Sequence, residues 1–197
     1  MHRYLVRRTG IAAGAAELDA ALTRLRSFEE TPPAHAPPAR WLRSYAVREA
    51  DGRLGLLCLF EAADAAALAR HAGLTHNAVD EIVPLHATAA LRAFAPNRVY
   101  LVRRRGLCAA DADPTLALAR IGDAPEMSGR LSRLRSYAVG DGAQTLGSWC
   151  LLQAVDADAV REHAALTALP INEITPVIGR IVFRDETRPP SAQALPA

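Results

Sequence analysis

A long segment of this chain occurs twice, and this internal repeat constrains the fold more than any other feature of the sequence. The six residues Leu42–Val47 recur unchanged as Leu134–Val139, at an offset of 92 positions. From position 41 to position 84, about 21 of 44 residues are identical to their mates at that offset. A repeat of this length is too long for one unit of a solenoid. Each copy is therefore expected to be a whole domain.

The two copies have the same order of predicted elements. The first has a strand at 3–8, a helix at 14–28, hairpin strands at 41–49 and 53–61, a helix from Asp64 to Gly73, and a strand after Glu81. The second has 98–104, 113–121, 133–139, 145–153, Asp156 to Ala165, and a strand after Glu173. This order predicts an α+β fold of two tandem ferredoxin-like (βαββαβ) repeats. The expected domains are 1–95 and 96–187, followed by a loose tail at 188–197.

The hairpins predict how the two copies meet. A two-residue turn at Asp51-Gly52 places Tyr45 opposite Cys58. One face then carries Trp41, Arg43, Tyr45, Leu56, Cys58 and Phe60, and the other carries Leu42, Ser44, Ala46, Leu57, Leu59 and Glu61. Both faces are largely apolar, and helices can cover only one of them. The second face is expected to pack on the other copy's sheet, which gives an intramolecular dimeric α+β barrel with a ligand cavity between sheet and helices.

Composition excludes several classes of partner. The net charge is only +2, so neither nucleic acid nor a membrane surface is an expected partner. No apolar run reaches the roughly 20 residues that span a bilayer, and the first residues lack the apolar core of a signal peptide. The three cysteines form no framework, which favours a cytoplasmic protein with reduced thiols. The arginine groups at 7–8 and 103–105 are expected to be solvated strand ends, with an anion site as the alternative. Because the two repeats pair within the chain, we expect a monomer.

Six residues that occur in both copies are candidates for binding a small molecule: Arg43, Tyr45 and Cys58, with their mates Arg135, Tyr137 and Cys150. An arginine in a cavity can bind a carboxylate or phosphate, and a tyrosine can donate a hydrogen bond. The alternatives are an ion pair at the surface for the arginines, and ordinary core packing for the tyrosines and cysteines.

Four histidines are candidate metal ligands or proton carriers. His71 and His163 occupy matching places late in the second helix of each copy, whereas His76 and His86 occur in the first copy alone. Imidazole nitrogen is a common ligand of divalent transition metals, so a site for such a metal would be asymmetric. The alternative for His71 and His163 is a helix C-terminal histidine that is favoured by the helix dipole.

Five short motifs together resemble the domain-of-unknown-function family 4242. They are RYLVRR at position 3, WLRSYAV at 41, LCLFEA at 57, RHAGL at 70 and DEIVP at 80. The resemblance covers both copies, roughly residues 2–87 and 98–183. It implies a ferredoxin-like fold and, because the family is described as nickel-binding-protein-like, nickel as the metal. The family's nickel-binding member is rich in histidine near its first strand, whereas the first strand here ends in Arg7 and Arg8, with only His2 nearby.

Three hypotheses about function follow. The first is a protein that binds a small ligand or a transition metal such as nickel. The second is a cofactor-independent enzyme, an oxygenase or isomerase, whose cavity would hold Arg43, Tyr45, Cys58 and His71. The third is a regulatory or scaffold module with a filled interior and no ligand.

Overall fold

The computed structural model describes residues 1–90, 98–121, 127 and 129–182. The first half contains β1 (His2–Ala12), α1 (Ala15–Glu30), β2 (Ala39–Arg48), β3 (Leu54–Ala62), α2 (Ala65–Leu74) and β4 (Glu81–Ala90). The second half contains β5 (Arg98–Ala109), α3 (Pro114–Arg120), β6 (Leu131–Gly140), β7 (Thr145–Ala154), α4 (Ala157–Leu166) and β8 (Glu173–Val182). The predicted order of elements and the α+β class are confirmed. The predicted domain boundary at 95 and the tail at 188–197 lie outside the described residues.

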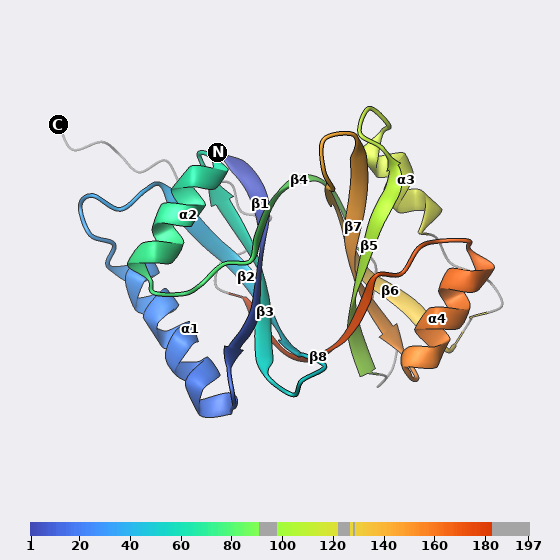
Figure 1. Cartoon of the computed structure of the whole chain (residues 1–197), viewed down its shortest axis with the longest axis horizontal. Coiled ribbons are helices and arrows are strands. Elements are labelled where there is room, and N and C mark those ends of the chain that lie inside the picture. The colour runs from blue at the N-terminus through green and yellow to red at the C-terminus, as the bar shows by residue number, and fades with distance from the viewer. Residues whose placement is uncertain (91–97, 122–126, 128, 183–197) are drawn as a thin grey trace.

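The strands form a closed barrel in the order β1-β3-β2-β8-β5-β7-β6-β4, and all pairs of strands are antiparallel. Two strands close it. The first residues of β4 pair with β1, and its later residues pair with β6 of the other half. In the same way β8 pairs first with β5 and then with β2. Figure 1 shows β4 and β8 crossing between the two halves, with α1 and α2 covering one outer face and α3 and α4 the other.

Three apolar clusters hold these layers together. Two of them lie between a sheet and its helices: one includes Trp41, Cys58 and Phe60 in the first half, and the other includes Cys150 and Leu152 in the second. The third lies between the two sheets and includes Tyr45 and Tyr137 among leucines and valines of both halves. The prediction that the second face of each sheet packs on the other sheet is therefore confirmed.

The predicted hairpin register is wrong by one residue. The Glu49 N–H donates to the Arg53 carbonyl at 2.8 Å, so the loop has three residues and ends at Gly52, whose φ is +84°. A glycine in this left-handed conformation is typical of three-residue hairpin loops. The slip places Ser44 opposite Cys58, and Tyr45 opposite Leu57. Tyr45 therefore faces the other sheet while Cys58 faces the helices, because a one-residue slip exchanges the two faces of a strand.

Aspartate side chains cap the starts of three helices. The Asp64 carboxylate accepts a hydrogen bond from the Ala67 N–H at 2.6 Å, and Asp156 accepts one from Ala159 at 2.7 Å. Asp113 caps α3 through the Thr115 N–H, with Pro114 in the first turn. Within the described residues, no helix is both long enough and apolar enough to cross a membrane.

Candidate functional site

The space between the two sheets contains a pair of tyrosines. The hydroxyls of Tyr45 and Tyr137 lie 3.1 Å apart and are buried, and Arg43 Nη1 donates to the Tyr45 hydroxyl at 3.4 Å. The two hydroxyls thus satisfy each other across the junction of the halves. Leucines and valines from both sheets pack around them. The tyrosine pair is therefore part of an apolar cluster to which both halves contribute.

One end of the barrel carries two clusters of charged side chains. Arg7 Nη2 lies 2.9 Å from Glu49 Oε1 and 3.0 Å from Glu173 Oε1. Arg103 Nη2 lies 2.9 Å from Glu81 Oε1 and 3.3 Å from Asp141 Oδ1. Each arginine is thus paired with one carboxylate of its own half and one of the other half. The charged end of the barrel, as we call these six residues, is therefore shared by both halves.

Trp149 on β7 contacts both arginines. The Arg103 Cζ atom is 4.9 Å from the centre of the Trp149 ring, and the Arg7 Cζ atom is 5.8 Å from it. Both distances fall in the range of cation–π contacts. The first half has Leu57 at the matching position, so the charged end has one aromatic ring in place of two.

Glu49 is buried enough to alter its proton affinity. Burial raises the pKa of the Glu49 carboxyl, and the attraction of Arg7 opposes this rise only in part. The exposed fraction of the Glu49 side chain is 15%. The prediction that the arginine groups are solvated strand ends is wrong for four of them, because Arg7, Arg8, Arg103 and Arg104 are all buried. Closure of the barrel places these strand segments inside the protein.

The two repeated cysteines lie apart from the tyrosines. The Ser44 hydroxyl donates to Cys58 Sγ at 2.9 Å and accepts a bond from Trp41 Nε1 at 2.8 Å, all on the helix side of the sheet. Burial raises the pKa of the Cys58 thiol. A thiol nucleophile needs the opposite shift, so Cys58 is suited to packing. Cys150 is buried at the matching position of the second half.

His71 on α2 and His163 on α4 are both buried. His71 Nε2 lies 3.3 Å from Glu29 Oε1 on α1, and the Phe28 and Phe60 rings meet the imidazole edge-on. At the end of α2, the backbone carbonyl of His71 accepts hydrogen bonds from the Thr75 hydroxyl and from the Thr75 N–H. His71 thus lies in the last turn of α2, where both readings placed it, and its imidazole faces Glu29.

The histidines are not gathered into one metal centre. His76 and His86 are exposed, on the loop after α2 and on β4, whereas His71 and His163 are buried in different halves. Within the described ranges, no group of three or more His, Cys, Asp or Glu side chains is placed to hold a metal ion. Nickel binding therefore stays a prediction.

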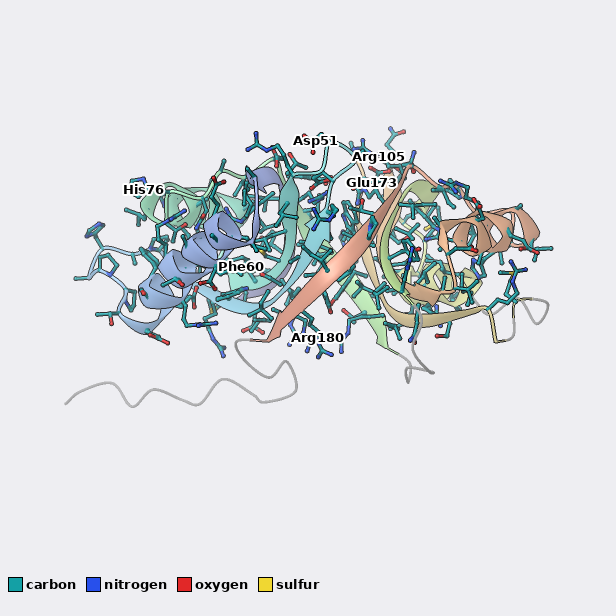
Figure 2. All side chains as sticks on the ribbon, turned by 90° about the horizontal axis from the view of Figure 1, so that it is seen from below. Asp51, Phe60, His76, Arg105, Glu173 and Arg180 are labelled. Atoms are coloured by element: carbon teal, nitrogen blue, oxygen red, sulfur yellow. The ribbon has the colours of Figure 1, made fainter. Side chains whose placement is uncertain are left out.

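The surface of the first half carries a hollow of about 570 Å³ between α2 and β4. We call it the α2 hollow, and it is lined by Ala69, Ala72, Gly73, His76, Asn77, Ala78, Val79, Asp80 and Ile82. Small apolar side chains provide part of the lining, and His76 and Asp80 provide polar groups. Figure 2 shows His76 on the outer side of the first half, away from the junction of the sheets.

A second hollow, of about 520 Å³, lies over the charged end of the barrel. We call it the hairpin hollow, and it is lined by Thr9, Gly10, Glu49, Ala50, Asp51 and Arg53. The Thr9 N–H and hydroxyl both donate to Asp80 Oδ2, so the walls of the two hollows are bonded to each other. Figure 2 shows Asp51 and Glu173 at the same edge of the molecule.

Sequence reasoning missed the residues of the charged end. A signal was present, because Arg7, Glu49 and Glu81 have mates of matching charge in Arg103, Asp141 and Glu173. The predicted ligand set is divided: Arg43, Tyr45 and Tyr137 meet between the sheets, Cys58 and Cys150 face the helices, and Arg135 lies on β6 beside β4.

No family model matches the sequence, and the comparison with curated proteins gives no match. Among solved structures, a proposed monooxygenase from Lactobacillus acidophilus NCFM is 10% identical, with a TM-score of 0.46 over 92% of this chain and 99% of that chain. A proposed monooxygenase from Fusobacterium nucleatum subsp. nucleatum is 10% identical, with a TM-score of 0.45 over 93% and 98%. An anthrone oxidase-like protein is 9% identical, with a TM-score of 0.42 over 92% and 93%. At these values the likenesses carry no argument about activity.

Proposed function

We propose that the protein binds a small organic molecule in the α2 hollow of its first half. The observation that carries this proposal is the hollow itself, whose volume of about 570 Å³ falls within the usual range for small-molecule sites. Ala72, Val79 and Ile82 offer an apolar surface, and His76 and Asp80 offer hydrogen-bonding groups beside it. Such a combination suits a compact ligand with an apolar body and a polar group.

The loop that forms one wall of the hollow is held at several points. The buried Arg8 guanidinium donates from Nη1 to the carbonyls of Asn77 at 2.5 Å and Ala78 at 3.0 Å. The Asn77 N–H donates to the Ala72 carbonyl, and Asp80 accepts both bonds from Thr9. A loop fixed in this way loses little further entropy when a ligand binds, which favours affinity.

His76 is the side chain that distinguishes this half from the other. His76 and its mate Ala168 both have φ of +51°, an unusual value for residues other than glycine. The backbone of the loop is thus alike in both halves, and only the first places an imidazole at the rim. Asp80 accepts from Thr9 through Oδ2, and its Oδ1 can accept a bond from a ligand donor.

A thermal-shift screen of small organic compounds tests the proposal, with Ala69→Trp as the variant that fills the hollow. Ala66→Trp is the matched control, because Ala66 is also exposed on α2 but does not line the hollow. A compound that stabilises the wild type and Ala66→Trp, but neither Ala69→Trp nor His76→Ala, supports the site. A compound that acts equally on all four proteins binds elsewhere and refutes it.

The same assay separates ligand from metal. Chelator-stripped protein is titrated with nickel, zinc, copper and cobalt, alongside His71→Ala and His163→Ala. Saturable stabilisation that is lost in either variant would favour metal binding at the second helix of a half. Stabilisation by organic compounds alone would favour the α2 hollow.

A second candidate function, a cofactor-independent enzyme of the isomerase type, rests on Glu49. Its carboxyl lies at the hairpin hollow, and burial raises its pKa, which makes the carboxylate a stronger base. Arg7 holds this carboxylate in place at 2.9 Å. If Glu49 removes a proton from a carbon acid, the protein should catalyse hydrogen–deuterium exchange into small ketones in D₂O, and Glu49→Gln should not. Equal exchange with both proteins would remove this candidate.

A further inference from the structure

Arg104 on β5 is a fully buried cation in the second half, with an exposed fraction of 0%. None of its three guanidinium nitrogens makes a hydrogen bond within the described part of the chain. A guanidinium has five N–H donors and stays charged in proteins. Burying such a charge without a partner is very costly, so this position calls for an anion.

The matching arginine of the first half, Arg8, is buried in the same way but has hydrogen-bond acceptors. Arg8 donates to the carbonyls of Asn77 and Ala78 in the loop after α2. The loop after α4 follows the same path, because the Leu169 N–H donates to Ala164 as Asn77 does to Ala72. Arg104 nevertheless makes neither of the bonds that Arg8 makes.

Two buried serines lie on the same face of the sheet as Arg104. Ser148 lies directly opposite it on β7, and Ser136 lies opposite Cys150, two residues further along that strand. Both serines are fully buried, and the Ser136 Oγ atom has no hydrogen bond in the described structure. In the first half the matching hydroxyl, Ser44, is occupied by Trp41 and Cys58.

Compared with the first half, this face of the second sheet carries smaller side chains and more positive charge. Leu56 of the first half is replaced by Ser148, and Phe60 is replaced by Leu152. Trp41 is replaced by Arg133, whose Nη1 donates to the Leu118 carbonyl of α3 at 2.7 Å. The second half has therefore exchanged apolar volume on this face for a hydroxyl at Ser148 and a further cation at Arg133.

We propose that the second half contains a buried site for a small monovalent anion, held by the Arg104 guanidinium and the Ser136 and Ser148 hydroxyls. Its occupant is a halide ion or the carboxylate of a small acid, because both present compact negative charge to N–H and O–H donors. This site is separate from the α2 hollow and does not depend on the function proposed for it.

The test is a set of thermal-shift titrations of protein dialysed into sodium gluconate, whose anion is too large for a buried site. Sodium chloride, bromide, formate and acetate are added at constant ionic strength. An anion present at a hundredfold its dissociation constant should raise the melting temperature of a chain this long by roughly 5–10 °C. A response to halides alone, or to carboxylates as well, distinguishes the two occupants.

Three variants locate the site. The anion response should disappear in Arg104→Met and weaken in Ser136→Ala, and it should persist in Ser44→Ala, the matched change in the first half. A crystal soaked in bromide gives a direct reading that requires no variant: an anomalous peak within hydrogen-bonding distance of the Arg104 guanidinium is expected. The proposal would be overturned if wild type and Ser136→Ala responded equally and no peak appeared at Arg104. It would also be overturned if the small anions stabilised the protein no more than gluconate does.

Discussion

Gly55 offers a sharp test of how the charged end of the barrel is built. A Cβ atom on Gly55 would lie 2.6 Å from the Arg8 carbonyl oxygen and 2.8 Å from Arg7 Nη1, and it would also meet Glu49 Oε1. The carbonyl belongs to the β1 backbone and cannot rotate away. Gly55→Ala must therefore displace strand β1 and disturb the Arg7–Glu49 ion pair.

The expected loss of stability is about 2–4 kcal/mol, because overpacking alone costs about 1–3 kcal/mol and a disturbed buried ion pair adds to it. For a chain of this length that lowers the melting temperature by roughly 5–15 °C. Urea unfolding followed by circular dichroism measures the free-energy change, and the slope of the transition shows whether the unfolded state has changed.

Gly73→Ala is the matched control, because a Cβ there meets nothing within 4 Å and the residue lies in α2. Alanine is favoured over glycine in helices by about 1 kcal/mol, so this variant should be at least as stable as the wild type. Gly147→Ala should behave like Gly55→Ala, because its Cβ would lie 2.6 Å from the Arg104 carbonyl oxygen. If Gly55→Ala were as stable as Gly73→Ala, the close packing argued for this end would be refuted.

Three further predictions concern other groups of the core. Tyr45→Phe and Tyr137→Phe should each cost about 1 kcal/mol in urea unfolding, and the double variant should cost less than the sum, because the two hydroxyls share one bond; additive losses would contradict that bond. The pKa of Glu49 in the folded protein is raised above the ordinary 4.5, so the free energy of unfolding should fall as the pH rises above 4.5 and Glu49 loses its proton. Unfolding measured at several pH values should show this fall in the wild type and not in Glu49→Gln. Cys58 should react with a thiol reagent only on unfolding, whereas the partly exposed Cys108 should react in the native protein, as mass spectrometry would show.

Local chemistry made much of the fold predictable. The helices that the sequence predicted from Asp64 and from Asp156 begin there, because each carboxylate caps an N–H group only three residues away. The repeat and the apolar character of both sheet faces predicted that the two sheets would pack together. The register of the first hairpin was wrong because Asp51-Gly52 suits two-residue and three-residue loops alike, and only the Glu49–Arg53 bond distinguishes them.

The candidate site was less predictable because it depends on pairing between distant strands. Arg7 and Arg8 resemble a solvated strand end when β1 is considered alone. They are buried because β4 joins β1 at one end of the barrel and Glu173 arrives from the other half. A charge pattern that repeats at a fixed offset shows that the two halves share a feature, but it does not show that each half completes the other.

The exchange of carboxylates between halves has a consequence for how the barrel holds together. Glu81 opens β4 and pairs with Arg103, and Glu173 opens β8 and pairs with Arg7. These are the same strands that pass from one sheet to the other and close the barrel. A single half would therefore lose the partner strand and one carboxylate of its buried arginine together, which leaves a cation that is costly to bury. Covalent fusion keeps the two halves at high effective concentration, so that neither arginine is left with half of its partners.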